Sequence, residues 1–277
     1  MRTVVVGASS GLGRSIATGL GQRGATVALL ARRHDRLVEA AKEAGPGALA
    51  IACDVTDPSS CQSAIAEAAR DLGGIDALLY ATGVGPLSRL VDVSLETWRS
   101  TFDTNVIGAA LVTAAAVPYL TESGGVAAYL SSVNGSLTPP WPGLGAYATS
   151  KAALETLVEA WRVEHPTVGF TTVIVGDCAG GEGDSMTEFT SGWDMNLALE
   201  LHPIWEARKV PGRLPHGGRG ARPGGRPRPA LRRQRQHSLG GGATAVARLR
   251  PASAQRLSSI LAMTVAPGNE PVMPELM

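Results

Sequence analysis

The chain has 277 residues, of which 44% are hydrophobic and 4% aromatic, and its net charge at pH 7 is +1. This length suits one α/β domain with a substantial core, and no run of about 20 apolar residues argues for a membrane span. The cysteines (three) and histidines (five) lack metal-ligand spacing, so we expect no metal site. An odd cysteine count and an N-terminus without a signal-peptide pattern favour a cytoplasmic protein.

Charge is divided unevenly along the chain. Residues 1–206 include 12 basic and 22 acidic residues, whereas residues 207–269 include 13 basic residues and no acidic one. Of the 26 residues in 211–236, 21 are Gly, Pro, Arg or Ala, a composition that cannot bury enough apolar surface to offset its ordering entropy. We therefore expect a folded domain over 1–206, an irregular basic segment over 207–259, and a last strand and tail over 260–277.

Short β-branched apolar runs alternate with helical patterns in residues 1–206, which is typical of βαβ units and a parallel sheet. The pattern predicts strands over 3–6, 26–30, 48–52, 75–80, 126–130 and 168–175. It predicts helices over about 12–23, 35–43, 95–120 and 146–163, and Asp57-Pro58 opens another helix in the usual N-cap and N1 order. The expected fold is a Rossmann-type, doubly wound α/β domain, which binds ligands at the carboxyl ends of its strands.

A glycine-rich turn, Gly7-Ala-Ser-Ser-Gly11-Leu-Gly13, separates the first strand from the first helix. Glycines let a backbone approach a pyrophosphate closely, and the helix N-terminus offers free N–H groups and a positive dipole end. Many turns are glycine-rich for conformational reasons alone, but this placement favours dinucleotide binding. The residues assigned to this contact are Gly7, Ser9, Ser10, Gly11, Leu12, Gly13 and Arg14.

The end of the second strand indicates which dinucleotide binds. An acidic residue there would accept hydrogen bonds from the ribose 2′-hydroxyl, whereas a cation accommodates a 2′-phosphate. The chain has Arg32-Arg33 and no carboxylate before Asp35, so Arg32 and Arg14, helped by the Ser9 hydroxyl, are expected to form a phosphate cradle. This predicts NADP(H), with NADPH preferred over NADH. The alternative is a solvated basic loop that opens the next helix.

The pattern richest in chemistry is Tyr147-Ala-Thr-Ser-Lys151, in the helix predicted over 146–163. Positions four apart lie on one helix face, so the Lys151 ammonium can lie beside the Tyr147 phenol. A free phenol titrates near pH 10, and a neighbouring cation favours phenolate and lowers that pKa. Tyr147 is then a candidate general acid or base, although the pair taken alone also suits an ordinary helix surface.

The glycine turn and the Tyr-x-x-x-Lys pair resemble those of the short-chain dehydrogenase/reductase family, over about residues 3–190. The resemblance implies hydride transfer between NADP(H) and a carbonyl or alcohol, with Tyr147 exchanging the proton and Lys151 lowering the phenol pKa and binding the nicotinamide ribose. It implies that Ser132 polarises the carbonyl, because strand alternation turns Ser131 to the opposite face. Asn105 matches an asparagine that holds a proton-relay water; the alternative is a helix asparagine that bonds a neighbouring carbonyl.

The chain departs from the family pattern at several positions. Val6 replaces a threonine, Tyr80-Ala-Thr-Gly83 replaces Asn-Asn-Ala-Gly, and Val175-Gly176 replaces Pro-Gly. Asp54 and Val55, after the third strand, are placed to meet the adenine. The other cofactor contacts expected are Ala81, Thr82, Gly83, Asn105, Tyr147, Lys151, Val175, Gly176 and Thr187.

These departures leave two other functions open: an NADP-binding sensor or scaffold with weakened catalysis, and a basic-arm protein that binds nucleic acid. The basic segment is either the product of a reading-frame disruption in a G+C-rich gene or an evolved polybasic arm. It lacks interleaved aromatic residues, which makes nucleic acid the less favoured partner. We expect a small-molecule carbonyl or alcohol as substrate and no membrane partner. A homo-oligomer stays open, because family tetramers use the long helices and the terminal strand.

Overall fold

The computed structural model describes residues 1–176 and 189–207. The basic segment expected beyond residue 207 and the last strand expected over 260–265 lie outside the described residues, as does Thr187.

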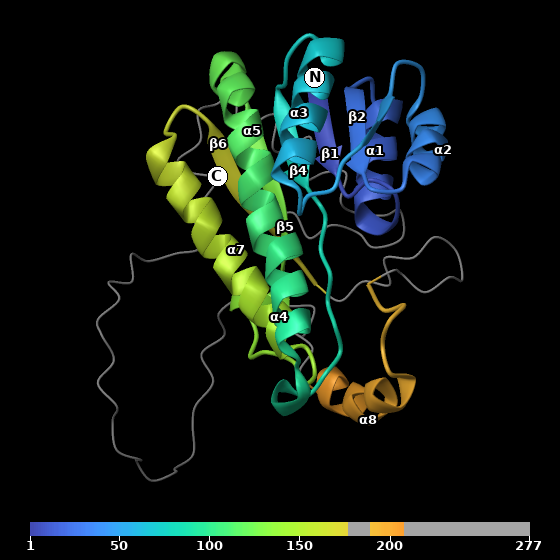
Figure 1. Cartoon of the computed structure of the whole chain (residues 1–277), viewed down its shortest axis with the longest axis vertical. Coiled ribbons are helices and arrows are strands. Elements are labelled where there is room, and N and C mark those ends of the chain that lie inside the picture. The colour runs from blue at the N-terminus through green and yellow to red at the C-terminus, as the bar shows by residue number, and fades with distance from the viewer. Residues whose placement is uncertain (177–188, 208–277) are drawn as a thin grey trace, which may run out of the picture.

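Six parallel strands form one sheet in the order β3-β2-β1-β4-β5-β6 (Figure 1). They are β1 (Arg2–Val6), β2 (Thr26–Ala31), β3 (Leu49–Ala52), β4 (Ala77–Tyr80), β5 (Val126–Ser132) and β6 (Gly169–Val175). The order reverses between β1 and β4, which is where such a sheet binds its ligand. The predicted Rossmann-type, doubly wound fold is confirmed.

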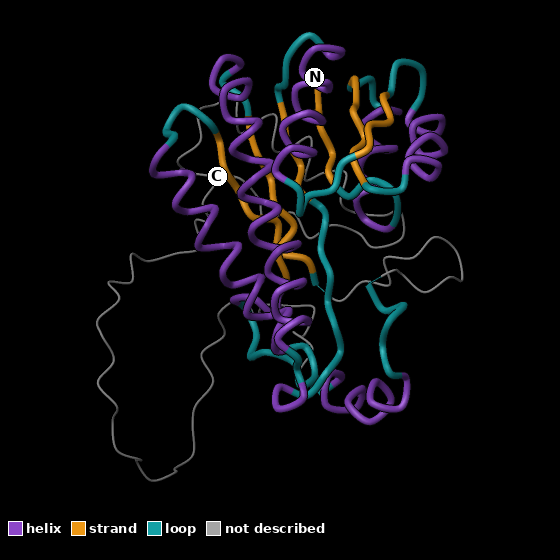
Figure 2. Tube along the Cα trace, in the orientation of Figure 1, coloured by secondary structure: helices purple, strands orange, loops and turns teal. Residues whose placement is uncertain are grey.

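Helices cover both faces of the sheet, as the purple and orange tubes of Figure 2 show. One face packs on α1 (Gly11–Gln22) and α2 (His34–Ala44), and the other on α3 (Pro58–Leu72), α5 (Gly108–Ser123) and α7 (Gly145–Glu164). Strand alternation divides the core accordingly: Val5 joins the α1 side, whereas Val4 and Val6 join the α3 side. The smaller helices are the 3₁₀ helix η1 (Leu90–Asp92), α4 (Leu95–Phe102), the π-helical η2 (Asp103–Ile107), α6 (Val133–Ser136) and α8 (Met195–Glu206).

The helix predicted to open at Asp57-Pro58 shows how local sequence sets an element. The Asp57 carboxylate caps α3, with Oδ1 accepting from the Ser59 N–H at 2.8 Å and the Ser60 N–H at 3.4 Å. Pro58 lacks an N–H and so suits the first helical position. Gly73 ends the helix in a left-handed conformation with φ of 73°, which glycine adopts without strain.

The long helix predicted over 95–120 runs from Leu95 to Ser123, with the π-helical turn η2 between α4 and α5. Within the described ranges it is the one helix long and apolar enough to cross a membrane by length and composition, with a mean hydropathy of 1.4. Of its most apolar window, 44% is buried in the protein, and α5 packs against α3 and the sheet. A core helix of a folded protein meets the same criteria of length and composition, so these criteria do not distinguish a core helix from a membrane span.

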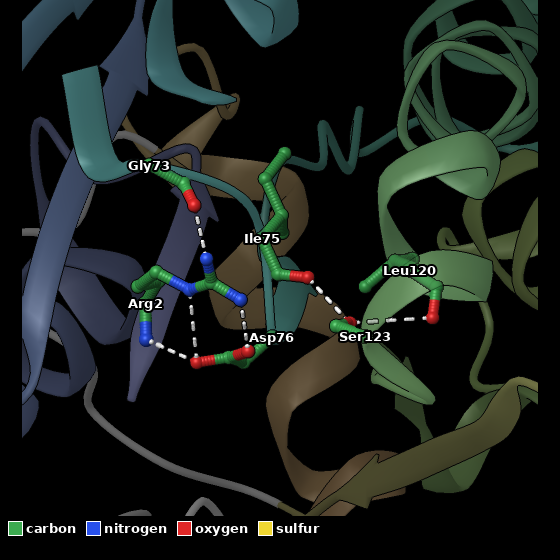
Figure 3. A network of polar contacts seen from close by, with 6 residues as sticks. All are labelled: Arg2, Gly73, Ile75, Asp76, Leu120 and Ser123. Carbon is green, nitrogen blue, oxygen red and sulfur yellow. Dashed lines mark hydrogen bonds and ion pairs between the residues drawn. The ribbon is translucent and has the colours of Figure 1, made fainter. Parts of the chain in front are cut away.

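A polar network ties the amino-terminal edge of the sheet together (Figure 3). Arg2 of β1 donates from Nη2 to Asp76 Oδ1 at 2.7 Å and from its backbone N–H to Asp76 Oδ2 at 2.9 Å. Its Nη1 donates to the Gly73 carbonyl. Ser123, at the end of α5, donates its hydroxyl proton to the Ile75 carbonyl at 2.7 Å. These contacts join β1, the approach to β4 and the end of α5.

Candidate active site

The glycine turn lies at the carboxyl end of β1, against the end of β4. Gly7 has φ of +87°, and a Cβ added there would lie 2.7 Å from the Thr82 backbone nitrogen. A Cβ at Gly13 would lie 2.2 Å from the Gly7 carbonyl oxygen, so only glycine lets α1 pack this closely on the turn. The result is a narrow backbone cradle beside the N-terminus of α1, which fits the pyrophosphate of a dinucleotide.

Arg33 is the basic residue that lies against the glycine turn. Its Nη2 donates to Ser9 Oγ at 2.9 Å and to Ser10 Oγ at 3.4 Å. Arg14, expected beside Ser9, instead bonds Glu43, with Nη2 and Oε1 2.6 Å apart, because α1 and α2 pack side by side. Burial first, and then the positive charges of Arg36 and Arg32, lower the pKa of Arg33. A bound anion would offset the repulsion among these three cations, so their positions favour the binding of a phosphate group.

The residues that follow β3 form a short polar turn at Asp54 and Thr56, and the apolar side chain of Val55 between them is buried. Asp54 Oδ1 accepts from the Thr56 N–H at 3.0 Å and from the Thr56 hydroxyl at 2.8 Å. These bonds lower the pKa of Asp54, and the charge of Arg32 adds to the shift. Val55 is buried, and a Cβ added at Gly108 of α5 would lie 2.9 Å from its Cγ2.

Tyr147 and Lys151 lie in the first two turns of α7, as predicted. The Lys151 Nζ lies 5.7 Å from the centroid of the Tyr147 ring and donates to the Leu130 carbonyl of β5 at 2.7 Å. Burial of Lys151, whose exposed fraction is 4%, lowers its pKa to about 8, and the negative charge of Glu155 opposes this shift. Lys151 is therefore mainly cationic at neutral pH and close enough to act on the phenol.

Asn105 is fully buried in the π-helical turn η2, a local irregularity that is common at functional sites. Its Oδ1 accepts from the Val84 N–H at 2.8 Å, and its Nδ2 donates to the Val84 carbonyl at 2.9 Å and to Ser150 Oγ at 2.9 Å. The amide therefore bonds the backbone of a residue 21 positions away, not the local helix carbonyl of the alternative interpretation. It joins the segment after β4 to α7; the water-holding role stays a prediction.

The segment Ala81-Thr82-Gly83 connects the glycine turn to the Tyr147–Lys151 pair. Thr82 packs on Gly7, and a Cβ at Gly83 would lie 3.3 Å from Lys151 Nζ and 3.5 Å from Asn105 Oδ1. The structure therefore brings Gly83, Asn105 and Lys151 together. Tyr80, one of the departures from the family pattern, donates its hydroxyl proton to the Thr104 carbonyl at 2.6 Å and holds η2 against β4.

The two serines at the end of β5 have different partners, as strand alternation predicts. Ser132 Oγ accepts from the Asn134 N–H at 3.2 Å and caps α6, whereas Ser131 Oγ donates to Glu155 Oε1 of α7 at 2.5 Å. Val175 pairs in register with Ser132 at the end of β6, and Gly176 follows directly. Both expected contacts of the last strand therefore lie at the same edge of the sheet as Ser132.

Sequence reasoning missed a cluster of aromatic side chains beside Tyr147. The Phe189 ring meets the Tyr147 ring edge-on, with centroids 5.0 Å apart, and the Trp193 ring lies 5.7 Å from that of Phe189. The Trp193 Nε1 donates to the Gly85 carbonyl at 2.7 Å. Four of the five tryptophans of this aromatic-poor chain fall within residues 141–205, which was a possible signal. The meeting of Trp141 and Trp205, which stack with centroids 6.1 Å apart, depends on tertiary packing.

The comparisons with known proteins agree with this geometry. The family model for short chain dehydrogenases matches residues 2–189. The chain therefore belongs to the short-chain dehydrogenase/reductase family, whose members are oxidoreductases that use a nicotinamide cofactor.

Two curated proteins illustrate the similarity. An 11-beta-hydroxysteroid dehydrogenase A from Sesamum indicum is 35% identical over 179 residues, which cover 62% of this chain and 51% of that protein. A short chain dehydrogenase from Pseudocercospora fijiensis is 34% identical over 210 residues, or 73% of this chain and 65% of that protein. The match thus spans about half of the sesame protein and about two thirds of the fungal one.

Solved structures show the same architecture. An alcohol dehydrogenase from the archaeon Thermococcus sibiricus, complexed with 5-hydroxy-NADP, has a TM-score of 0.62 at 25% identity and covers 74% of this chain and 89% of that one. A dehydrogenase/reductase from Sinorhizobium meliloti has a TM-score of 0.61 at 28% identity, and the match covers 66% of this chain and 75% of that one.

Proposed function

We propose that the chain is an NADPH-dependent oxidoreductase that interconverts a small-molecule carbonyl and the corresponding alcohol, with Tyr147 as the general acid and base. Family membership supplies the class of reaction. The observation that carries the proton-transfer role is the buried Lys151 ammonium beside the Tyr147 ring. A cation in surroundings of low dielectric acts strongly on a nearby phenol and favours its ionised form.

The residues divide the work as follows. In the reduction, Tyr147 donates its phenolic proton to the carbonyl oxygen, and in the oxidation it accepts the proton of the alcohol. Ser132, at the end of β5, would donate a hydrogen bond to the same oxygen. Lys151 stabilises the phenolate, and Asn105 fixes the segment that borders Lys151. A bound nicotinamide would supply or accept the hydride.

The proposed preference for NADPH rests on Arg33. The glycine turn would hold the pyrophosphate, and Arg33, with Ser9 and Ser10 as neighbours, would bind the 2′-phosphate. Arg33 thus takes the place expected for Arg14, because Arg14 forms an ion pair with Glu43, and Arg32 stays a proposed neighbour of the phosphate. Asp54 and Val55 remain the residues proposed to border the adenine.

NADPH consumption against a panel of aldehydes and ketones tests the activity. We expect turnover of at least one compound by the wild-type protein. Binding of NADPH without turnover of any panel member would favour the alternative of a cofactor-binding sensor with weakened catalysis.

Cofactor choice is tested with Arg33→Ala. Loss of a charge-assisted contact is expected to raise KM for NADPH by about tenfold or more, with KM for NADH nearly unchanged. The matched control is Arg70→Ala, which removes an exposed arginine of α3 paired with Asp71. Equal changes for the two cofactors in Arg33→Ala would remove the 2′-phosphate assignment.

A further inference from the structure

Glu155 lies one helical turn beyond Lys151 on α7 and has no role in the mechanism above. Residues four apart on a helix are neighbours on one face, so this carboxylate lies on the Lys151 side of α7. Its Oε1 accepts the Ser131 hydroxyl proton at 2.5 Å, and the adjacent residue of β5, Leu130, accepts from Lys151 Nζ at 2.7 Å. Two consecutive residues of β5 therefore hold the carboxylate and the ammonium.

The surroundings of this pair come from four elements. From β5 come the Leu130 carbonyl and the Ser131 hydroxyl, and from α7 come Tyr147 and Glu155. The segment after β4 contributes Gly83, and η2 contributes the neutral amide of Asn105.

A fifth element, α6, also packs against the pair. A Cβ added at Gly135 would lie 2.9 Å from Glu155 Oε1 and 3.2 Å from Lys151 Cβ, so the backbone of α6 lies directly over the pair. Glu155 is half-buried there. A carboxylate shielded from water acts more strongly on a neighbouring cation than one in bulk solvent.

Burial and the carboxylate act on Lys151 in opposite directions. Burial favours the neutral amine and lowers the pKa of Lys151 to about 8, whereas the charge of Glu155 favours the ammonium. A pKa of about 8 leaves little margin above neutral pH. If the carboxylate were removed, more of Lys151 would become neutral, and a neutral amine does not stabilise a phenolate.

We propose that Glu155 is a positioning residue that keeps Lys151 cationic, with the Ser131 hydroxyl holding its carboxylate in place. This inference rests on the proposed function, since the charge of Lys151 matters only if Tyr147 exchanges protons. It also assigns a role to Ser131, which the family resemblance set aside in favour of Ser132.

The titration of Lys151 tests the proposal without requiring turnover. The chain contains only three lysines, Lys42, Lys151 and Lys209, so NMR of ¹³Cε-labelled lysine gives few signals, and Lys151→Met assigns the one of interest. In Glu155→Gln, whose amide oxygen still accepts from Ser131, we expect the pKa of Lys151 to fall by about one unit. Ser131→Ala keeps the charge but frees the carboxylate and is expected to give a smaller fall.

Glu159→Gln is the matched control. Glu159 lies one turn further along the same helix, is exposed, and pairs with Arg162, so the pKa of Lys151 should not change. An unchanged Lys151 titration in Glu155→Gln, or an equal fall in Glu159→Gln, would overturn the proposal. Circular dichroism spectra of all variants establish that each is folded.

Turnover provides the second readout. With a carbonyl compound that the wild type reduces, the alkaline limb of the kcat profile should move to lower pH in Glu155→Gln, by the same amount as the Lys151 titration. An unmoved limb together with a shifted titration would contradict the link to catalysis. If no panel compound is reduced, the proposed function fails, and the titration alone still decides whether Glu155 sets the charge of Lys151.

Discussion

The two edges of the sheet hold charged side chains in opposite ways. At the amino-terminal edge, the Arg2 guanidinium and the Asp76 carboxylate bond each other directly, and the structure gains from both charges. At the carboxyl edge, the Lys151 ammonium is buried against a neutral carbonyl, and burial lowers its pKa to about 8.

The difference separates a contact that stabilises the fold from one that prepares a reaction. A charge bonded directly to an opposite charge has its desolvation offset by that partner. The Lys151 ammonium bonds a neutral carbonyl, and the nearby Glu155 carboxylate offsets its desolvation only in part, so its burial raises the free energy of the folded state. The carboxyl edge thus retains an arrangement that costs stability, as the proposed role of Lys151 in proton transfer requires. Four substitutions sharpen or break this comparison.

Tyr147→Phe is expected to have the largest effect. Removal of the phenolic hydroxyl deletes the proton donor and should lower kcat by about 10²–10⁴-fold, while the ring and its contact with Phe189 remain. Steady-state NADPH oxidation and denaturant unfolding measure the two properties. Turnover within a few-fold of wild type would contradict the assignment of the general acid.

Lys151→Met should lower kcat by a similar order but increase stability at neutral pH. The unfolded chain, in which lysine titrates near 10.4, binds the proton more tightly than the native protein with its pKa of about 8. The cationic lysine therefore opposes folding below pH 8, and wild-type stability gains as pH rises from about 8 to 10.4.

We accordingly expect the free energy of unfolding of Lys151→Met to exceed that of wild type by about 1 kcal/mol at pH 7. The difference should shrink as pH rises through 8, where native Lys151 loses its proton. Urea unfolding at several pH values tests this, with the exposed Lys42→Met as control. A variant less stable than wild type at pH 7 would contradict the comparison between the two edges.

Asp76→Ala should show the opposite pattern at the other edge. It removes the carboxylate bonded to the side chain and backbone N–H of Arg2, and should destabilise the protein by about 1–3 kcal/mol. NADPH affinity and kcat per folded molecule should not change. Asp71→Ala, at an exposed pair with Arg70, is the control and should cost less than about 1 kcal/mol.

Ser123→Ala should have the smallest effect. It removes the hydroxyl that joins the end of α5 to the Ile75 carbonyl, so a loss of about 1 kcal/mol in unfolding free energy is expected, with unchanged turnover. Urea unfolding measures it, and Ser100→Ala, whose exposed hydroxyl bonds within its own helix, should change stability by less than about 0.5 kcal/mol. Equal losses of unfolding free energy in Ser123→Ala and Ser100→Ala would mean that the bond to Ile75 stabilises the protein no more than an exposed bond within a helix does.

Much of the framework followed from local patterns. Each of the six strands came from a short apolar run, and the caps at Asp57 and Gly73 set α3 by chemistry contained in the sequence. The order of the glycine turn and the Tyr147–Lys151 pair likewise indicated the family, and the family model matches residues 2–189.

The partners of the site residues did not follow, because they come from elements far apart in the chain. Whether Arg14 or Arg33 meets Ser9 depends on how α2 packs against α1, which brings Glu43 to Arg14. The Asn105 amide bonds both backbone groups of Val84, which lies 21 positions away and which no local pattern indicates as its partner.

The sequence by itself determined the strands, the helix faces and the residue types available for proton transfer. Only the tertiary structure decided their electrostatics, since the pKa of Lys151 depends on burial under α6 and on a carboxylate held by a serine of β5. Spacing along a helix brings two side chains to one face. The solvent excluded around them, which sets how strongly they interact, depends on every element that packs there.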